Sequence, residues 1–228
     1  MCIRDSLYSF LKSHLKCKTI VFFATCSQVR HAWDLFCRLR PGLSVLAIHG
    51  KLSQTKRLQV YDKFTTTPYS VMFATDVASR GLDFPNVDWV VQNDAPEDYD
   101  MYVHRVGRTA RFQQDGQALL LLDPIEEESF IQKNKQAKEK KLKTNLQKKS
   151  INPTKTMLVT QRSASLVAEH NTLYALAKKA FWSYVRSMSL LPKDGIWSDL
   201  QIRDFHLEEY AHSLGLPNIP GDLEKVLE

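Results

Sequence analysis

TIVFFATCSQVRHAWDLFCRLRPGLSVLAIHGK, residues 19–51, contains two short apolar runs joined by an amphipathic stretch. The runs, 19–24 and 44–48, are almost continuously apolar, which is typical of strands covered on both faces. Ser27 is placed to cap a helix between them. Apolar residues recur there at helical spacing, namely Val29, Ala32, Trp33, Phe36 and Leu39. This order predicts two parallel strands joined by a crossover helix.

The same alternation continues to about Asp123. Three more apolar runs lie at 70–74, 88–92 and 117–122, and a second helix is expected to start at Ser53. That helix should bury three residues, Leu58, Tyr61 and Phe64. The whole succession predicts an α/β fold, a parallel sheet with helices on both faces. Ligands bind beyond the carboxyl ends of such strands, so the polar residues there become site candidates: Thr25, His49, Gly50, Thr75 and Asp76.

Beyond Asp123 the chain changes character. Residues 126–152 are expected to form a charged connector, in which Lys133 to Lys149 hold eight lysines and one acid, Glu139. This segment carries a net charge of +7, so the rest of the chain sums to −1 out of the total of +6. The basic pI is therefore no evidence that the whole surface binds nucleic acid. The segment could be a solvated helix face, a linker or a nonspecific RNA tether.

Residues 153–220 are expected to form a small α-helical C-terminal extension. One helix is predicted from apolar residues at helical spacing: Leu173, Leu176, Ala177, Ala180, Phe181, Tyr184 and Val185. A second is predicted from Leu207, Tyr210, Ala211 and Leu214, with Gly215 as its cap. We expect the aromatic residues to serve packing. At the other end of the chain a short helix is expected at 7–15, and residues 1–6 fit neither pattern and look adventitious.

HRVGRTAR, residues 104–111, holds three arginines around Gly107. A guanidinium stays charged at any working pH and offers a planar fork of donors that suits phosphate oxygens. If the segment is helical, Arg108 and Arg111 share a face and can converge on one ligand. The alternative is a pair of surface arginines bound to acidic residues.

A second polar cluster lies in ATDVASRGLDFP, residues 74–85, directly after an expected strand. Gly81 permits a turn there, in which backbone amides can approach a phosphate. The carboxylate of Asp83 could accept a ribose hydroxyl. The alternative is an ordinary loop around a caged arginine, Arg80.

Taken together, these segments resemble the second RecA-like domain of the DEAD-box RNA helicases over about residues 15–125. The resemblance rests on HGKLSQTKR (49–57), ATDVASRGLD (74–83) and HRVGRTAR (104–111), with weaker support from VFFAT (21–25). It implies that Arg108 and Arg111 are arginine fingers, which reach across a cleft to the triphosphate of ATP. It also implies that Gly81 and Asp83 contact the ATP ribose. Ala110 departs from the glycine of many members.

The resemblance implies two further roles. His104 and Arg105 would couple the nucleotide to RNA across the cleft, although a purely structural role for Arg105 is an alternative. The residues implied in RNA-backbone contact are Thr25, Gly50, Gln54, Arg57 and Thr75.

Two elements of a complete enzyme are missing from the sequence. Its one Gly-Lys pair, Gly50-Lys51, is followed by Leu52 and does not fit GxxxxGK[ST], and no Asp-Glu dipeptide occurs. We therefore expect the C-terminal half of an enzyme that is inactive alone, with ATP and Mg²⁺ bound mainly by an N-terminal RecA domain. The alternative is a noncatalytic RNA-binding or scaffold module that keeps a RecA-like fold.

AFWSYVRS (180–187) and EEYAHSLGLPNIP (208–220) resemble the C-terminal extension of nucleolar DEAD-box proteins of ribosome biogenesis. This implies a role in pre-rRNA processing in the nucleus and nucleolus, with pre-rRNA or small nucleolar RNA and pre-ribosomal proteins as partners. The expected division is a helicase C-terminal domain at 7–125, the connector at 126–152 and the extension at 153–220. No apolar run of about 18 residues suggests a membrane span.

Overall fold

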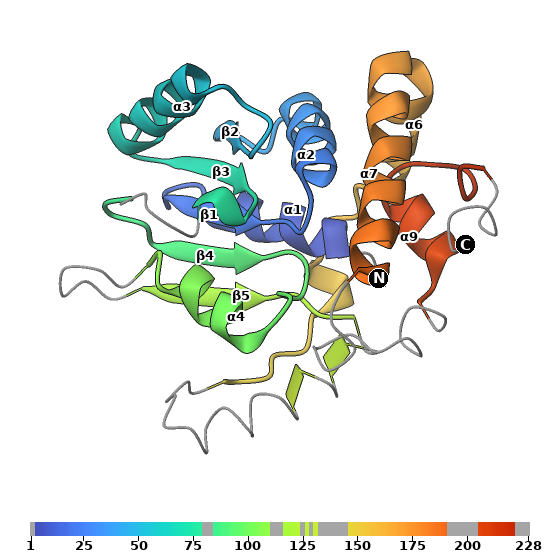
Figure 1. Ribbon diagram of the computed structural model, residues 1–228. Helices are drawn as coiled ribbons and strands as arrows, with labels where there is room; N and C mark the ends of the chain where they lie inside the picture. The colour runs from blue at the N-terminus through green and yellow to red at the C-terminus, as the bar shows by residue number, and fades with distance from the viewer. Residues whose placement is uncertain are drawn as a thin grey trace.

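A five-stranded parallel sheet forms the centre of the molecule (Figure 1). The computed structural model describes residues 3–78, 84–109, 116–123, 126–127, 130–131, 146–190 and 205–221. The strand order is β2-β3-β1-β4-β5, and every neighbouring pair is parallel. The bounds are β1 (Thr19–Phe22), β2 (Ser44–Ile48), β3 (Ser70–Ala74), β4 (Trp89–Gln92) and β5 (Gln117–Leu120). The predicted α/β class is thereby confirmed.

Helices cover both faces of the sheet, as predicted. On one face, α1 (Ile3–Ser13) and α2 (Cys26–Leu39) pack Leu11 and Phe36 against Val21 and Phe73. On the other face, α3 (Gln54–Thr66) packs Phe64 among residues from three strands, Phe22, Ile48 and Met72. Burying each of these large apolar side chains stabilises the fold by about 1.5–3 kcal/mol.

Three predictions about side chains on these elements are wrong. The cap of α2 is Thr25 and not Ser27, since Thr25 and Gln28 bond reciprocally as a capping box and the helix begins at Cys26. Trp33 is 42% exposed, and its indole donates to the Val45 carbonyl (3.1 Å) instead of entering the core. Leu58 is 50% exposed, and of the three residues expected to be buried on α3 only Phe64 is fully buried. The predicted start of α3 is confirmed, with Ser53 as its cap.

β5 also departs from the expectation of strands covered on both faces. It is the edge strand of the sheet and ends at Leu120, whereas the apolar run continues to Leu122. Gln117 and Ala118 are exposed, and Leu119 and Leu120 are only half-buried. An edge position leaves one side of a strand without a neighbouring strand, so apolarity alone overstates its burial.

The C-terminal helices pack onto the sheet domain. They are α6 (Thr160–Glu169), α7 (Asn171–Ser189) and α9 (Leu207–Ser213), and α7 lies along α2 (Figure 1). Most of the predicted apolar positions of α7 are buried: Leu173, Ala177, Ala180, Phe181, Tyr184 and Val185. They share one core with Leu35 of α2. The aromatic residues Phe181 and Tyr184 thus serve packing, as expected.

Gly215 ends α9 as predicted, with φ +82°. A Cβ added at Gly215 would lie 2.8 Å from Cγ2 of Val167, so both the backbone conformation and the neighbouring helix require glycine here.

The first helix begins earlier than expected. α1 starts at Ile3, and Asp5 is only 2% exposed because its Oδ1 accepts from the Val159 amide (2.8 Å). The Thr160 hydroxyl donates to the other oxygen of Asp5 (2.9 Å). Residues 3–6, which fit no sequence pattern, are therefore part of α1 and hold the start of α6. The prediction of a helix at 7–15 misplaced both ends.

No helix in the described ranges is long and apolar enough to cross a membrane. Most of the lysine run lies outside the described residues; within them, Lys148 forms an ion pair with Glu127.

Candidate functional site

The carboxyl ends of four strands meet at one edge of the sheet. The register pairs Phe22 at the end of β1 with Ala74 of β3 and Gln92 of β4, and Ile48 of β2 pairs with the same Ala74. The segments that follow these strands hold the candidates chosen from the sequence, so those candidates gather along this edge.

One corner of this edge combines the loop after β2 with the start of α3. Gly50 and Gln54 are exposed there, and Arg57 is half-buried. The Arg57 guanidinium donates from Nη2 to the Gly50 carbonyl oxygen (2.6 Å), which ties the helix to the loop. Three of the five residues implied in RNA contact therefore lie within about one helical turn of each other.

The two threonines among the candidate RNA-binding residues are less available for contact with RNA. Thr75 is 7% exposed, and its amide donates to the Ile48 carbonyl (3.3 Å). The hydroxyl of Thr25 caps α2 and also lies 2.8 Å from the Ser183 hydroxyl of α7. Both threonines therefore shape the edge through contacts inside the protein.

Arg105, the first arginine of the HRVGRTAR segment, is firmly anchored. It lies on α4 (Tyr99–Val106), and it is 2% exposed. Its guanidinium binds Asp76 through two parallel hydrogen bonds, Nε to Oδ1 (2.7 Å) and Nη2 to Oδ2 (2.9 Å). Nη1 donates to the Asp94 carbonyl (3.3 Å), and the guanidinium carbon lies 5.5 Å from the centre of the Phe22 ring. Such bidentate pairs are the strong ones, so Arg105 fixes α4 to the sheet edge.

The other described residues of the HRVGRTAR segment differ from Arg105 in exposure or in position. His104 is exposed on α4. The helix ends at Val106, where the Gly107 amide donates to the Val103 carbonyl (2.8 Å), and Arg108 follows in a turn. The condition under which Arg108 and Arg111 would share a helical face is therefore not met at Arg108. Gly81, Asp83 and Arg111 lie outside the described residues.

Thr109 holds the turn that carries Arg108 and was missed by sequence reasoning. It is 4% exposed, and its hydroxyl donates to the Val87 carbonyl (2.5 Å). Nothing in a lone threonine signals this contact, because Val87 is distant in sequence. Arg108 thus stands between two anchors, Arg105 on one side and Thr109 on the other.

A buried polar network adjoins Arg105 and was also missed. Asp94 follows β4 and is 6% exposed; its carboxylate accepts from the Ala24 amide (3.0 Å) and from Nε2 of Gln28 (3.3 Å). The Gln28 side chain also donates to the Tyr210 hydroxyl of α9 (3.1 Å). Burial raises the pKa of Asp94, against the lowering effects of the Ala24 amide, of Arg105 and of the Asn93 side chain. The sequence signal that could have identified Asp94 is its position after an apolar run, at the carboxyl end of a predicted strand.

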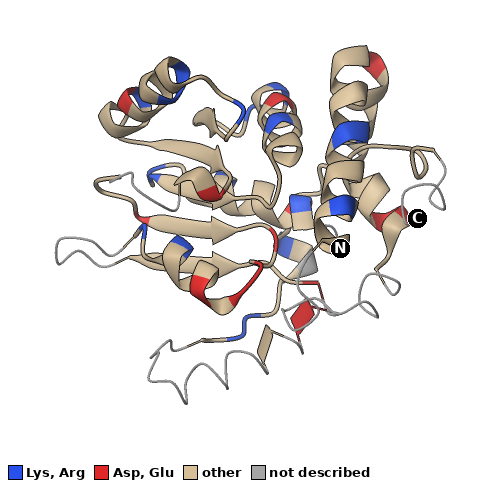
Figure 2. Ribbon diagram, viewed as in Figure 1, with Lys and Arg blue, Asp and Glu red and all other residues tan. Residues whose placement is uncertain are grey.

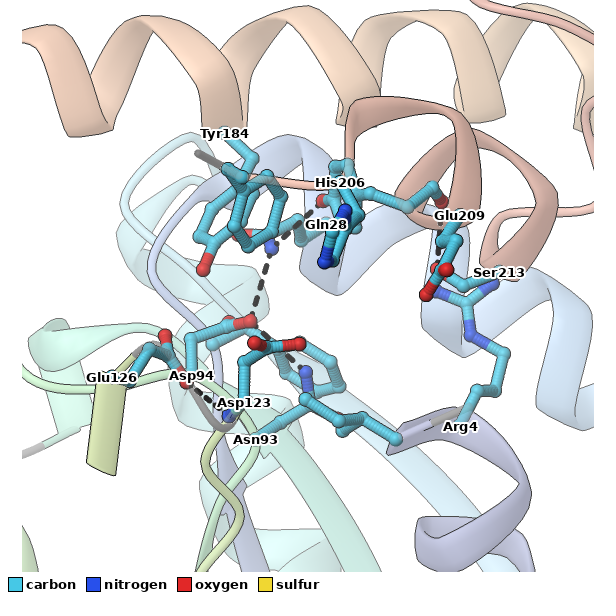
Figure 3. A pocket seen from close by; sticks show the side chains of 14 residues that line it. Arg4, Gln28, Asn93, Asp94, Asp123, Glu126, Tyr184, His206, Glu209 and Ser213 are labelled. Carbon is cyan, nitrogen blue, oxygen red and sulfur yellow. Dashed lines mark hydrogen bonds between the residues drawn. The ribbon is translucent and has the colours of Figure 1, made fainter. Parts of the chain in front are cut away.

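The network borders a pocket between the sheet edge and the C-terminal helices (Figure 3). Acidic side chains line it, namely Asp94, Asp123, Glu126 and Glu209, together with Arg4 and His206. Glu126 is 2% exposed, and its Oε2 accepts from the Asp123 amide (2.6 Å). Burial, reinforced by the nearby Asp94 and Asp123, raises the pKa of Glu126 well above its ordinary value.

We predict that Glu126→Gln makes stability less dependent on pH. A raised folded-state pKa means that the folded chain binds the proton more tightly, so this stabilisation is present below the unfolded pKa and is lost as pH rises through the folded pKa. Urea midpoints at about pH 5 and about pH 8 should converge in the variant. The exposed Glu169, changed to Gln, is the matched control. A variant whose midpoints separate as widely as those of the wild type would contradict the prediction.

The described residues contain no group of three or more His, Cys, Asp or Glu side chains arranged to hold a metal ion. No step through a metal is therefore derived from them.

Comparison with known proteins identifies the class. Residues 3–113 match the helicase conserved C-terminal domain, and residues 170–222 match the C-terminal extension of the family described as ATP-dependent rRNA helicase SPB4-like. The chain is 45% identical to "Probable ATP-dependent RNA helicase DDX10" of Mus musculus over 94% of its own length and 24% of the relative. It is 44% identical to ATP-dependent RNA helicase dbp4 of Schizosaccharomyces pombe over 95% of this chain and 28% of the relative. The chain thus spans about a quarter of the length of these relatives.

Solved structures agree on the fold. Domain 2 of the DEAD-box helicase Mss116p, bound to an RNA duplex, superposes with a TM-score of 0.60 at 19% identity, over 93% of this chain and 83% of that one. The E. coli DEAD-box protein SrmB, bound to RraA, superposes with a TM-score of 0.54 at 28% identity, over 65% of this chain and 84% of that one. The sheet, the anchored arginine segment and these matches define a RecA-like helicase C-terminal domain with a helical extension. The chain belongs to the DEAD-box RNA helicase family.

Proposed function

We propose that the chain acts as the C-terminal half of an ATP-dependent DEAD-box RNA helicase that remodels RNA duplexes. The observation that carries this proposal is the bidentate anchoring of Arg105 to Asp76, which sets the segment from His104 to Thr109 at the sheet edge. The corner formed by Gly50, Gln54 and Arg57 lies along the same edge. An enzyme that couples ATP hydrolysis to RNA remodelling needs nucleotide and RNA sites close to each other, and here both candidate sites lie along one edge of the sheet.

In this function Arg108 and Arg111 stabilise the charge that grows on the triphosphate during hydrolysis. Gly81 and Asp83 contact the ribose. ATP and Mg²⁺ are held mainly by an N-terminal RecA domain, and the ion would neutralise phosphate charge there. His104 transmits nucleotide binding to RNA, and Arg105 supports this coupling by holding α4 in place.

RNA contact is assigned to the phosphate backbone. Gly50, Gln54 and Arg57 form its accessible part, while Thr25 and Thr75 contribute chiefly by shaping the adjacent loops. Backbone contacts position a protein on RNA without reading sequence, so we expect little sequence preference from these residues.

The biological setting is proposed to be pre-rRNA processing during ribosome biogenesis, in the nucleus and nucleolus, with pre-rRNA or small nucleolar RNA and pre-ribosomal proteins as partners. The support is the match of residues 170–222 to a family described as rRNA helicases. We further propose the functional division into a helicase C-terminal domain (7–125), a connector (126–152) and an extension (153–220).

The test is to fuse the chain to the N-terminal RecA domain of the Schizosaccharomyces pombe relative and to measure ATP hydrolysis with and without RNA. We expect RNA-stimulated hydrolysis from the fusion and little from either half alone. RNA binding without stimulated hydrolysis would favour the noncatalytic module instead.

A further inference from the structure

A basic groove lies between the sheet domain and α7, outside the residues considered so far. Four segments line it: the start of α2, the loop after β2, α7, and the chain after α9. Its cationic residues are Arg30, Lys51, Lys178 and Lys179, its aromatic residues are Tyr174 and Trp182, and Ser27, Pro220 and Gly221 complete the lining. Among these described lining residues none is acidic. Figure 2 shows lysine and arginine on both α2 and α7.

We propose that this groove binds single-stranded RNA and extends the path that begins at Arg57. The cations would bind successive phosphates, and the aromatic rings would offer stacking surfaces to bases, the combination found in sequence-tolerant single-strand binding. The proposal rests on the proposed function and assigns to the C-terminal extension a share of the RNA surface.

The groove and the corner at Arg57 share the loop after β2, which supplies Lys51 to the groove and Gly50 to the corner. The side chain of His49 in the same loop is buried, and burial lowers its pKa, with further lowering by Arg30, Lys51 and Arg57. Two of those cations line the groove, and the third is tied to Gly50. Cations of the groove and of the corner therefore lie close enough together to act on the same imidazole.

The aromatic residues are held in position within the groove. The indole of Trp182 donates to the Pro220 carbonyl (2.6 Å), and the Lys178 ammonium lies 4.8 Å from the centre of the Tyr174 ring. Tyr174, Lys178 and Trp182 follow one another at intervals of four residues, so they share one face of α7. Ordered rings beside cations favour a nucleic-acid strand over a purely acidic peptide, which would gain little from them.

The test measures binding of the full chain to a fluorescent oligouridine at several salt concentrations. Lys178→Glu combined with Lys179→Glu should weaken binding and reduce the slope of log K against log salt by at least about 1.4, since each single-strand phosphate contact contributes about 0.7. Tyr174→Ala should weaken binding several-fold and leave that slope unchanged. The matched control, Lys155→Glu with Arg162→Glu, reverses two exposed charges outside the groove and should keep nearly all of the affinity.

All of these side chains are exposed, so urea unfolding should coincide with that of the wild type and exclude misfolding as a cause. Equal RNA affinity for the groove variant and the control would overturn the proposal. So would a groove variant that loses binding to polyglutamate but not to oligouridine, which would indicate an acidic protein partner. RNA-stimulated hydrolysis by the wild-type fusion, measured separately, shows whether the proposed function stands when this inference fails.

Discussion

Arg108→Ala, introduced into the fusion with an N-terminal RecA domain, should lower RNA-stimulated ATP hydrolysis by a factor of about 10³ to 10⁵. The physical reason is that a finger guanidinium stabilises charge present chiefly in the transition state, so its loss acts on turnover. The turn that presents Arg108 depends on the Gly107 cap and on the Thr109 hydroxyl. Removing the side chain should therefore leave the backbone in place and the unfolding midpoint nearly unchanged.

Two further variants sharpen this prediction. Arg108→Lys keeps the charge but loses the planar fork, so it should recover only a small part of the rate. Arg111→Ala should have an effect similar to that of Arg108→Ala. An exposed arginine of α6, changed in Arg162→Ala, serves as the control for loss of a surface charge. Near wild-type turnover in Arg108→Ala would refute its role as a finger.

Arg105→Ala should destabilise the chain by about 3 kcal/mol, the lower end of the cost of breaking a buried ion pair, because Asp76 is 34% exposed and can regain water. The loss also leaves the Asp94 carbonyl without the Nη1 donor and opens a space above Phe22. Urea unfolding of the chain measures this effect, and hydrolysis by the fusion should fall with it because α4 loses its tie to the sheet.

The matched control for this variant is Arg38→Ala. Arg38 also binds a carboxylate, Asp34, at 2.9 Å, but one turn away on the surface of α2 and 32% exposed. Exposed pairs of this kind contribute about 0.3–0.5 kcal/mol. If both variants lose the same small amount of unfolding free energy, Arg105 is not the anchor that its geometry indicates.

The sheet and the edge at which the candidate site residues gather could be predicted from the sequence, because both follow from local patterns. Apolar runs mark the central strands, and parallel strands place the residues after Phe22, Ile48 and Ala74 at one edge. The start of α3 at Ser53 and the end of α9 at Gly215 are likewise local features.

What could not be predicted depends on contacts between distant residues. Trp33 and Leu58 match helical periodicity, yet both remain largely exposed in the folded chain. Asp5 is buried by Val159, more than 150 residues away, and Thr25 is bonded to Ser183 of α7. The turn after α4 is held by a hydrogen bond from the Thr109 hydroxyl to the Val87 carbonyl, which no pattern within HRVGRTAR reveals.

The contacts of Asp5 indicate that the sheet domain and the C-terminal helices form one cooperative folding unit. Its carboxylate joins the first turn of α1 to the start of α6, and Leu35 shares a core with the helices that follow. A chain cut before α6 would expose an apolar stripe of α2 and remove the amide and hydroxyl donors that hold the Asp5 carboxylate. The two segments matched by separate family models should therefore melt as one transition, and trimming the molecule to the helicase segment alone would yield a weakened, aggregation-prone fragment.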